Sequence, residues 1–421
     1  MPPKPPSPEA PLDDWLRWQE ALHPQAIALG LERVQQAGAR LGLPAGGIRT
    51  VTVAGTNGKG SSTALLAEIY RAAGYRVGAY SSPHLLRYNE RIAIDGRPLP
   101  DRELVNAFVA VEAARGATPL TYFEFGTLAA LWLFRQAGAQ VQVLEVGLGG
   151  RLDAVNIVDA DGALVTNIGL DHVEFLGNDR ERIGFEKAGI LRRGRPAVCV
   201  DPDPPRAIGQ HAAAIGASLW HLGKDYGYRR VADAWNWRGP DASYKKLPPP
   251  ALAGAIQFRN AAGVVALVSR LQALLPVPET AIRAGLARVR LAGRFERRGN
   301  VILDVAHNVE AARVLADNLG GIGASALRFV VGIFADKPFE GFLQALGAPA
   351  GRFYLGGLPP PRGLAGEALR RRAGAVAPGA PVFDTVEEAF RQARAESREG
   401  ELIVACGSFL TVAAVAGCLD G

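Results

Sequence analysis

Residues 49–73 read RTVTVAGTNGKGSSTALLAEIYRAA. The β-branched run Arg49–Ala54 predicts a strand, and Ser62–Ala73 predicts a helix that stops at Gly74. Between them, Gly55–Ser61 offers unhindered backbone N–H groups at a helix N-terminus, where phosphate oxygens bind well. We therefore predict a phosphate-binding loop, and with it an enzyme that binds and hydrolyses a nucleoside triphosphate.

The loop departs from the generic phosphate-loop motif G-x-x-x-x-G-K-[ST]. Val53 stands in the place of the first glycine, and Gly60 separates Lys59 from Ser61. Because strand, loop and helix follow one another in the expected order, we favour phosphate binding over a plain glycine-rich turn. Lys59 would then reach the β- and γ-phosphates, and Ser61 or Ser62 would lie near a magnesium ion.

Strand and helix patterns alternate along most of the chain, which predicts an α/β fold with a largely parallel sheet. A basic segment at 291–298 interrupts the alternation, which then begins afresh. We place a domain boundary near 291–297. This gives a P-loop-type N-terminal domain with a mostly parallel sheet, 1–290, and a smaller Rossmann-like α/β domain, 291–421. The polar, proline-rich stretch Trp235–Pro250 should form a surface excursion. The other predicted elements are the strands Arg76–Tyr80, Val141–Val146, Ala163–Ile168, Val301–Asp304, Leu327–Gly332 and Leu402–Ala405, and the helices Phe123–Ala137, Asn260–Leu274, Glu279–Val289, Glu310–Leu319 and Val386–Ala395.

The composition is that of a soluble globular protein, with 48% hydrophobic and 21% charged residues. No apolar stretch approaches the ~20 residues that span a bilayer, and no hydrophobic segment of a secretory signal begins the chain, so we expect no membrane contact and a cytoplasmic location. Three cysteines without C-x-x-C spacing exclude a structural zinc site and a disulfide framework. The formal charge of +6 suits anionic ligands, but scattered basic residues argue against nucleic acid.

Polar side chains follow three predicted strands of the first domain. Ser82 comes after Arg76–Tyr80, Glu145 lies near the end of a buried strand, and His172 follows Ala163–Ile168. Ligands of open α/β sheets bind beyond the carboxyl ends of strands. Glu145 is therefore placed to hold a divalent metal near a triphosphate, although a strand-end glutamate is as often a helix cap or an ion-pair partner. His172 at a neighbouring strand end favours a shared site over a structural histidine.

The second domain has a comparable cluster. Arg294 lies in the interdomain segment, and Asp304, His307 and Asn308 close the strand Val301–Asp304. These groups suit contacts with ribose or phosphate. An Asx turn that caps the following helix explains them equally well from sequence alone.

Taken together, the motifs resemble those of the folylpolyglutamate synthase/dihydrofolate synthase family, within the Mur-ligase-like superfamily of ATP-dependent amide-forming ligases. The resemblance runs from about Trp15 to about Val415. It also accounts for the unusual loop, because this family uses the shorter form GTNGKG[ST]. Its motifs are AGTNGKGS (54–61), YSSPHL (80–85), LTYFE (120–124), LEVGLGGRLDAVN (144–156), LDH (170–172), EKAGI (186–190), LAGRFE (291–296) and DVAHN (304–308).

The resemblance implies a role for each matching residue. The nucleotide would be bound by Thr56, Asn57, Gly58, Lys59, Gly60, Ser61, Asn260, Arg294 and Asp304. Magnesium would be bound by Ser82, Glu145 and His172, and the pterin substrate by Leu22, His23, Pro24, Thr121, Tyr122, Phe123, Glu124, Leu152, Asp153 and Ala154. Catalysis would involve Lys59, His172, His307 and Lys187, the lysine that the family carbamylates. Carbamylation requires an unprotonated amine, and only seven of the 47 basic residues here are lysines.

The implied reaction is the ATP-dependent addition of L-glutamate to dihydropteroate and to reduced folates through an acyl phosphate. ATP and Mg²⁺ are the expected cofactors, a monovalent cation such as K⁺ stays open, and the expected partners are small molecules bound by a monomer. A monofunctional folylpolyglutamate synthase, or another Mur-type amide ligase, is the alternative. The chain departs from the family pattern at Ala28, where an aspartate is common, and at Pro338 in the DKD motif.

Overall fold

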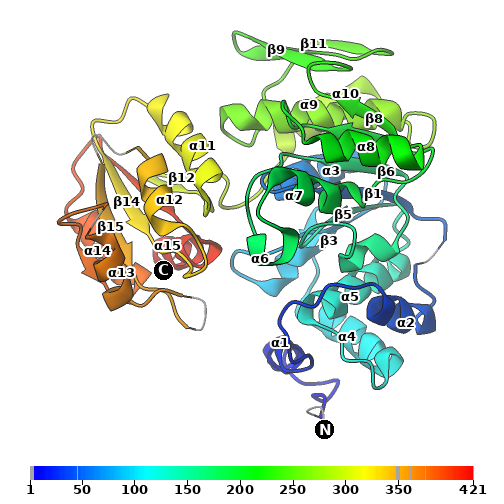
Figure 1. Cartoon of the computed structure of the whole chain (residues 1–421), viewed down its shortest axis with the longest axis horizontal. Helices are drawn as coiled ribbons and strands as arrows, with labels where there is room; N and C mark the ends of the chain where they lie inside the picture. The colour runs from blue at the N-terminus through cyan, green and yellow to red at the C-terminus, as the bar shows by residue number, and fades with distance from the viewer. Residues whose placement is uncertain (1–3, 45, 348–350, 361–362, 375, 421) are drawn as a thin grey trace. The chain divides into compact units, whose positions relative to one another are not determined.

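The computed structural model describes residues 4–44, 46–347, 351–360, 363–374 and 376–420 (Figure 1). Contacts within the chain divide it into two compact units. The first unit comprises Met1–Ala251 with Gln257–Val289, and the second comprises Leu252–Ile256 with Arg290–Gly421. In the part of the chain described, no helix is long and apolar enough to cross a membrane.

The first unit is built on an eight-stranded sheet with the order β4-β3-β2-β5-β1-β6-β7-β8. The six strands β2, β5, β1, β6, β7 and β8 run parallel, and β3 is antiparallel to both of its neighbours, β2 and β4. Most central positions are buried on both faces, which explains the continuous apolar runs in the sequence. The strands are β1 (Arg49–Ala54), β2 (Val77–Tyr80), β3 (Ile92–Ile94), β4 (Arg97–Pro98), β5 (Val141–Glu145), β6 (Gly162–Val165), β7 (Pro196–Cys199) and β8 (Ser218–His221).

Helices cover both faces of this sheet. On one face Gly78 of β2 lies against Phe134 of α5, and on the other Gly162 of β6 lies against Leu267 of α9. The pairs α3–α10, α4–α5 and α7–α8 pack together. The helices are α1 (Leu12–Glu20), α2 (Glu32–Arg40), α3 (Lys59–Ala72), α4 (Asp101–Arg115), α5 (Tyr122–Gln136), α6 (Val173–Leu176), α7 (Arg180–Ala188), α8 (Arg206–Ile215), α9 (Ala255–Arg270) and α10 (Glu279–Arg288), with short 3₁₀ helices η1 (Tyr88–Arg91) and η2 (Ala154–Ile157).

Most of the predicted surface excursion forms two strands of a small antiparallel sheet. The sheet consists of β9 (Gly227–Val231), β10 (Ala234–Arg238) and β11 (Ser243–Leu247). The segment is more ordered than its polar, proline-rich composition suggested. Trp235 and Trp237 are fully buried, and the indole N–H of Trp237 donates to the carbonyl of Ala262 in α9. Two tryptophans on one strand face therefore anchor an otherwise polar hairpin.

The second unit is a six-stranded sheet with the order β12-β13-β17-β14-β15-β16, in which only β12 is antiparallel. It has its own apolar core, to which strands and helices both contribute. The strands are β12 (Glu296–Arg298), β13 (Val301–Leu303), β14 (Leu327–Val331), β15 (Gly351–Gly356), β16 (Val382–Phe383) and β17 (Leu402–Cys406), and the helices are α11 (Val309–Gly320), α12 (Phe339–Ala345), α13 (Gly366–Ala373), α14 (Val386–Ala395) and α15 (Phe409–Asp420).

The predicted fold class is confirmed: a mostly parallel α/β sheet in the first part of the chain and a smaller α/β sheet after it. Two element boundaries differ in ways that matter for the site. Helix α3 begins at Lys59, three residues before the predicted start, and β6 ends at Val165 instead of Ile168. Residues 166–168 therefore belong to a loop that is free to fold over the glycine loop.

Candidate active site

The register of four parallel strands brings the predicted site segments to one edge of the sheet. Tyr80 of β2 pairs with Leu144 of β5, and the next residue of β5, Glu145, pairs with Val53 of β1. On the other side of β1, Ala54 pairs with Val165 of β6. The segments that follow these strands therefore start level with one another. Ser82 follows β2, the glycine loop follows β1 and His172 follows β6. Glu145 is the last residue of β5.

Two glycines of the loop lie where a side chain would meet close neighbours and where φ is positive. Gly55 has φ +150°, and a Cβ there would lie 1.6 Å from Oγ1 of Thr166. Gly58 has φ +86° and forms the N-cap of α3, and a Cβ there would lie 3.0 Å from Oδ1 of Asn260. Asn260, predicted to bind the nucleotide, thus lies directly against the loop. Only glycine fits both backbone positions.

The loop after β6 holds the glycine loop through its backbone. The N–H of Thr56 donates to the carbonyl of Asn167 (2.8 Å), and the N–H of Asn57 donates to Oδ1 of the same residue (2.7 Å). The hydroxyl of Thr56 donates to the carbonyl of Gly169 (3.1 Å) and accepts from its N–H (3.0 Å). Thr166, Asn167 and Gly169 were missed in the sequence. The signal that could have found them is the pair Thr166-Asn167 at the end of a strand, because Glu145 was chosen for lying at the end of a strand.

Two lysines meet at the carbonyl oxygen of Gly55. Nζ of Lys59 donates to it (3.0 Å) and to the carbonyl of Thr56 (3.2 Å), while Nζ of Lys187 donates to it from α7 (2.8 Å). Lys187 is only 4% exposed. Burial, reinforced by the positive charge of Lys59, lowers the pKa of Lys187 to about 7. A substantial fraction of this amine is therefore neutral near physiological pH, and neutral amines are nucleophiles.

The three predicted metal ligands offer a carboxylate, an imidazole and a hydroxyl. Glu145 is 3% exposed at the end of β5, and His172 takes φ +51° as the residue that starts α6. Over the described residues, no group of three or more His, Cys, Asp and Glu side chains could hold a metal ion by itself. This donor set fits an ion such as Mg²⁺ that takes few protein ligands and fills its shell with water and phosphate oxygens.

Residues 121–124 begin α5, and part of this predicted substrate site is structural. The hydroxyl of Thr121 accepts from the N–H of Glu124 (3.2 Å), and the carboxylate of Glu124 accepts from the N–H of Thr121 (2.7 Å), which makes a capping box. Glu124 also pairs with Arg33 of α2 (2.9 Å). Phe123 lies against Gly147, two residues beyond Glu145, and 5.6 Å from the ring of Tyr80. The Glu124 carboxylate is thus held by the cap and the ion pair, whereas Phe123 packs against the segment that follows β5.

The other predicted pterin residues fall in two connected segments. The carbonyl of Leu152 accepts from the N–H of Gly30 (3.3 Å), which ties residues 152–154 to the chain that follows Leu22, His23 and Pro24. Asp153 caps η2, and its carboxylate accepts from the N–H groups of Leu148 and Val155. Burial raises the pKa of Asp153 to about 7.

In the second unit, the cluster predicted after β13 is present. Asp304 accepts from the N–H groups of Phe295 (2.9 Å) and Ala306 (2.8 Å), and burial raises its pKa. The guanidinium of Arg294 and the ring of His307 both lie beside the ring of Phe409. Asn308 caps α11 by accepting from the N–H of Ala311, so the capping interpretation holds for this residue.

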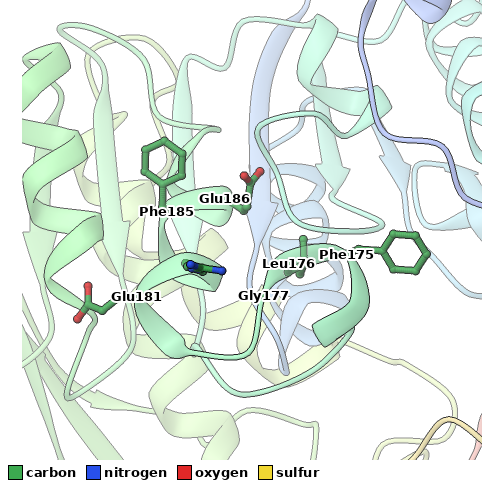
Figure 2. Close-up of a pocket in the computed structure, with 7 residues that line it drawn as sticks. Phe175, Leu176, Gly177, Glu181, Phe185 and Glu186 are labelled. Atoms are coloured by element: carbon green, nitrogen blue, oxygen red, sulfur yellow. The ribbon is translucent and has the colours of Figure 1, made fainter.

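A separate pocket of about 410 Å³ opens between α6 and α7 (Figure 2). Phe175 and Phe185 flank it, and Glu186 lies between them in this view. It contains none of the predicted site residues, although His172 starts α6 and Lys187 follows Glu186 in α7.

Comparison with known proteins identifies the chain's relatives. The Mur ligase middle domain matches residues 53–238, and the glutamate ligase domain of Mur ligases matches residues 293–409. The dihydrofolate synthase/folylpolyglutamate synthase of Escherichia coli (strain K12) is 43% identical over 419 residues, covering 99% of this chain and 97% of that protein. The chain belongs to the dihydrofolate synthase/folylpolyglutamate synthase family.

Members of this family have been solved with ligands. The structure described as E. coli FolC in complex with DHPP and ADP has a TM-score of 0.93 at 42% identity and covers 99% of both chains. A bifunctional synthase with Mn, AMPPNP and L-glutamate bound has a TM-score of 0.91 at 43% identity, covering 99% of this chain and 100% of that one. The family predicted from the motifs is therefore confirmed, and the chain is an ATP-dependent ligase.

Proposed function

We propose that the protein uses ATP to join L-glutamate to dihydropteroate and to reduced folates. The observation that carries the proposal is the convergence of the glycine loop, Lys59 and Lys187 with Glu145 at one edge of the sheet, in a chain of this family. A carboxylate is a poor electrophile. Transfer of the γ-phosphoryl group of ATP makes it an acyl phosphate, the amine of glutamate attacks the acyl carbon, and phosphate leaves.

Each residue of the loop has a defined task in this reaction. Thr56 and Asn57 hold the loop on Asn167, the backbone N–H groups of 58–61 bind the phosphates, and Lys59 exchanges its two carbonyl acceptors for phosphate oxygens when the nucleotide enters. A divalent ion, which we propose to be Mg²⁺, held by Ser82, Glu145 and His172 would supply positive charge against the triphosphate. Asn260 fixes the path of the loop at Gly58.

We further propose that Lys187 is carbamylated. Its neutral amine would add to CO₂ with loss of one proton to give a carbamate anion. Starting from the protonated amine, two protons leave in all, and a cation beside Lys59 becomes an anion. Burial and the neighbouring Lys59 both favour the neutral, nucleophilic amine, and the positive charge of Lys59 also favours the carbamate anion. The carbamate N–H would keep the hydrogen bond to the carbonyl of Gly55 that the amine makes.

The acceptor would lie along Phe123, Tyr122 and the segments at 22–24 and 152–154. The proposal assigns residues 1–290 to the ATP- and pterin-binding domain and 291–421 to a Rossmann-like ligase domain, which is supported by the separate Mur ligase matches. It includes a monomeric state and a cytoplasmic location, which light scattering and cell fractionation test.

The decisive experiment measures glutamate-dependent ADP release with dihydropteroate and with tetrahydrofolate as parallel acceptors. We expect both acceptors to stimulate release, and mass spectrometry to find the glutamylated product of each. Stimulation by tetrahydrofolate alone would leave a monofunctional folylpolyglutamate synthase. Stimulation by neither acceptor would remove the proposal.

A further inference from the structure

We propose that the ion pair between Arg180 and the buried Asp201 positions the nucleotide-binding loop, so that both are positioning residues for the ligase reaction. Neither residue belongs to the predicted site. The inference rests on the proposed function only in requiring that the glycine loop bind a nucleotide.

Asp201 follows β7 and is 4% exposed. Its Oδ2 accepts from the N–H of Ile168 (2.8 Å) and from the guanidinium of Arg180 (3.1 Å), and its Oδ1 accepts from the N–H of Asp203 (3.0 Å). Three donors thus converge on one buried carboxylate. Both oxygens of the Asp201 carboxylate therefore serve as acceptors.

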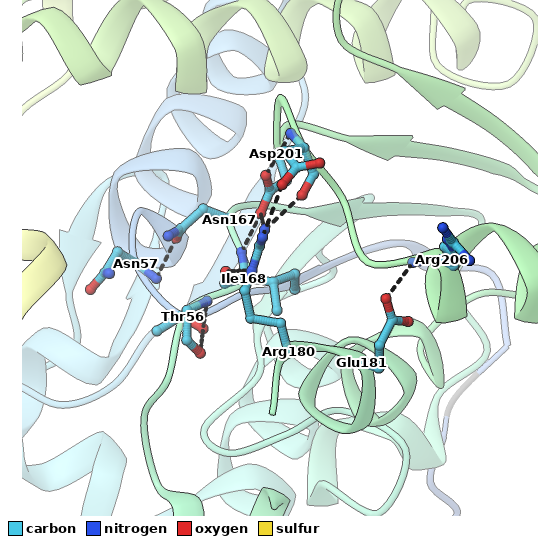
Figure 3. A network of polar contacts seen from close by, with 10 residues as sticks. Thr56, Asn57, Asn167, Ile168, Arg180, Glu181, Asp201 and Arg206 are labelled. Carbon is cyan, nitrogen blue, oxygen red and sulfur yellow. Dashed lines mark hydrogen bonds and ion pairs between the residues drawn. The ribbon is translucent and has the colours of Figure 1, made fainter. Parts of the chain in front are cut away.

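Arg180 is the first residue of α7 and completes the arrangement (Figure 3). Its Nε donates to the carbonyl of Ile168 (2.9 Å), and its outer nitrogens donate to Asp201 and to the carbonyl of Asp203 (2.7 Å). Both backbone polar groups of Ile168 are therefore held by this one ion pair. A planar guanidinium has the fork of donors that such a junction needs, whereas a lysine does not.

Ile168 stands between the two residues that grip the glycine loop. Asn167 binds the N–H groups of Thr56 and Asn57, and Gly169 exchanges two hydrogen bonds with the hydroxyl of Thr56. Fixing Ile168 fixes both neighbours. The chain reaches the proposed metal ligand His172 three residues beyond Gly169.

The same arginine anchors a second contact to the loop. Helix α7 starts at Arg180 and carries Lys187 near its other end, where Nζ donates to the carbonyl of Gly55. The ion pair therefore orients both structures that hold the loop, namely residues 167–169 and α7. Both elements that Arg180 joins contact the glycine loop, and we therefore infer that the ion pair positions the loop.

Asp203 provides a matched control. Its carboxylate also pairs with Arg180 (3.2 Å), but that side chain is 92% exposed, whereas the carboxylate of Asp201 binds the N–H of Ile168 directly. Asp203→Asn therefore removes an ion pair of Arg180 without touching the loop. Asp201→Asn makes the same change in size and charge. In the wild type the donors use both carboxylate oxygens of Asp201, whereas the asparagine offers them one accepting oxygen.

The test measures the Kd of ADP and of AMPPNP by calorimetry, and the KM values for ATP, glutamate and dihydropteroate. For Asp201→Asn we expect nucleotide affinity to fall about tenfold, the KM for ATP to rise by a similar factor, and the KM values of the other substrates to stay within about twofold. Asp203→Asn should match the wild type throughout. Asp201→Glu should recover part of the affinity, because it restores the second accepting oxygen.

Unchanged nucleotide affinity in Asp201→Asn overturns the inference, and so does an equal loss in Asp203→Asn. A rise of all three KM values by the same factor, together with a lowered Tm, also overturns it, because a purely structural role gives that result. If Asp201→Asn does not fold, Arg180→Lys, at a side chain that is 40% exposed, undergoes the same measurements and should show the same selective loss. A wild type that binds no nucleotide would refute the proposed function instead.

Discussion

At the scale of single residues, the unusual feature is the sharing of one carbonyl oxygen by two ammonium groups. Lys59 and Lys187 both donate to Gly55, although one is at a helix start and the other is buried in α7. Two cations at this distance repel each other, and burial adds to the cost of charging Lys187. The protein thus has a lysine with a strongly lowered pKa beside the nucleotide-binding loop, and such pKa shifts are typical of functional sites.

Lys187 should make the stability of the protein depend on pH. Between pH about 7 and the ordinary lysine value of 10.5, the unfolded chain binds a proton at this residue that the folded chain does not, so the free energy of unfolding should rise with pH. Below about 7 both states are protonated and the contribution is constant. Each unit of pKa difference is worth about 1.4 kcal/mol.

Urea unfolding at several pH values in CO₂-free buffer measures this effect in the wild type and in Lys187→Met. The variant should lose the rise, whereas Lys224→Met, at an exposed lysine, should keep it. An equal pH dependence in wild type and Lys187→Met would contradict the assignment.

At the scale of elements, strand ends and helix starts do most of the positioning. The N-terminus of α5 combines a capping box with the Arg33–Glu124 pair, which joins α2 to α5 with a carboxylate that is 4% exposed. Glu124 thus keeps Phe123 in place beside Gly147. If Phe123 contacts the substrate as proposed, Glu124 would act by orienting that ring.

Two substitutions separate the cap from the charge. Glu124→Gln can still accept from the N–H of Thr121 but cannot pair with Arg33, and should cost about 1–2 kcal/mol of unfolding free energy. Glu124→Ala removes both contacts and leaves Arg33 without its carboxylate, and should cost about 3–5 kcal/mol. Chemical denaturation compares the two, and equal losses would show that the charge alone matters.

At the scale of the whole molecule, the chain forms two compact units. The second unit has its own sheet and its own apolar core. Its parallel strands are joined by helices, so most of its contacts lie within residues 290–421. Such a unit satisfies the usual requirements for independent folding.

A fragment of residues 290–421 should therefore fold by itself. It loses the short segment Leu252–Ile256, in which the N–H of Ala255 donates to Oδ1 of Asn318. We expect a dispersed amide NMR spectrum and a cooperative denaturant transition. A collapsed spectrum without a cooperative transition would show that this unit depends on the rest of the chain.

Much of the fold could be predicted because its signals are local. The order of strands and helices around the glycine loop follows from β-branched runs, helical periodicity and glycine stops, and all eleven predicted strands and helices beyond the loop segment find a counterpart. The errors lie where local signals fade. The strand was expected to run on through residues 166–168, yet β6 ends at Val165, and Thr166 lies directly against Gly55 of the glycine loop.

The sequence by itself determined the glycine loop, the strand-end residues Glu145 and His172, and the family of ligases to which the chain belongs. Those features are contiguous motifs, and their chemistry follows from residue type and spacing. Only the tertiary structure decided that Lys187 reaches Gly55 across 132 positions of sequence, and that Arg180 and Asp201 hold the residue between Asn167 and Gly169. Contacts between distant segments leave no local period, because they are set by how strands are ordered in the sheet.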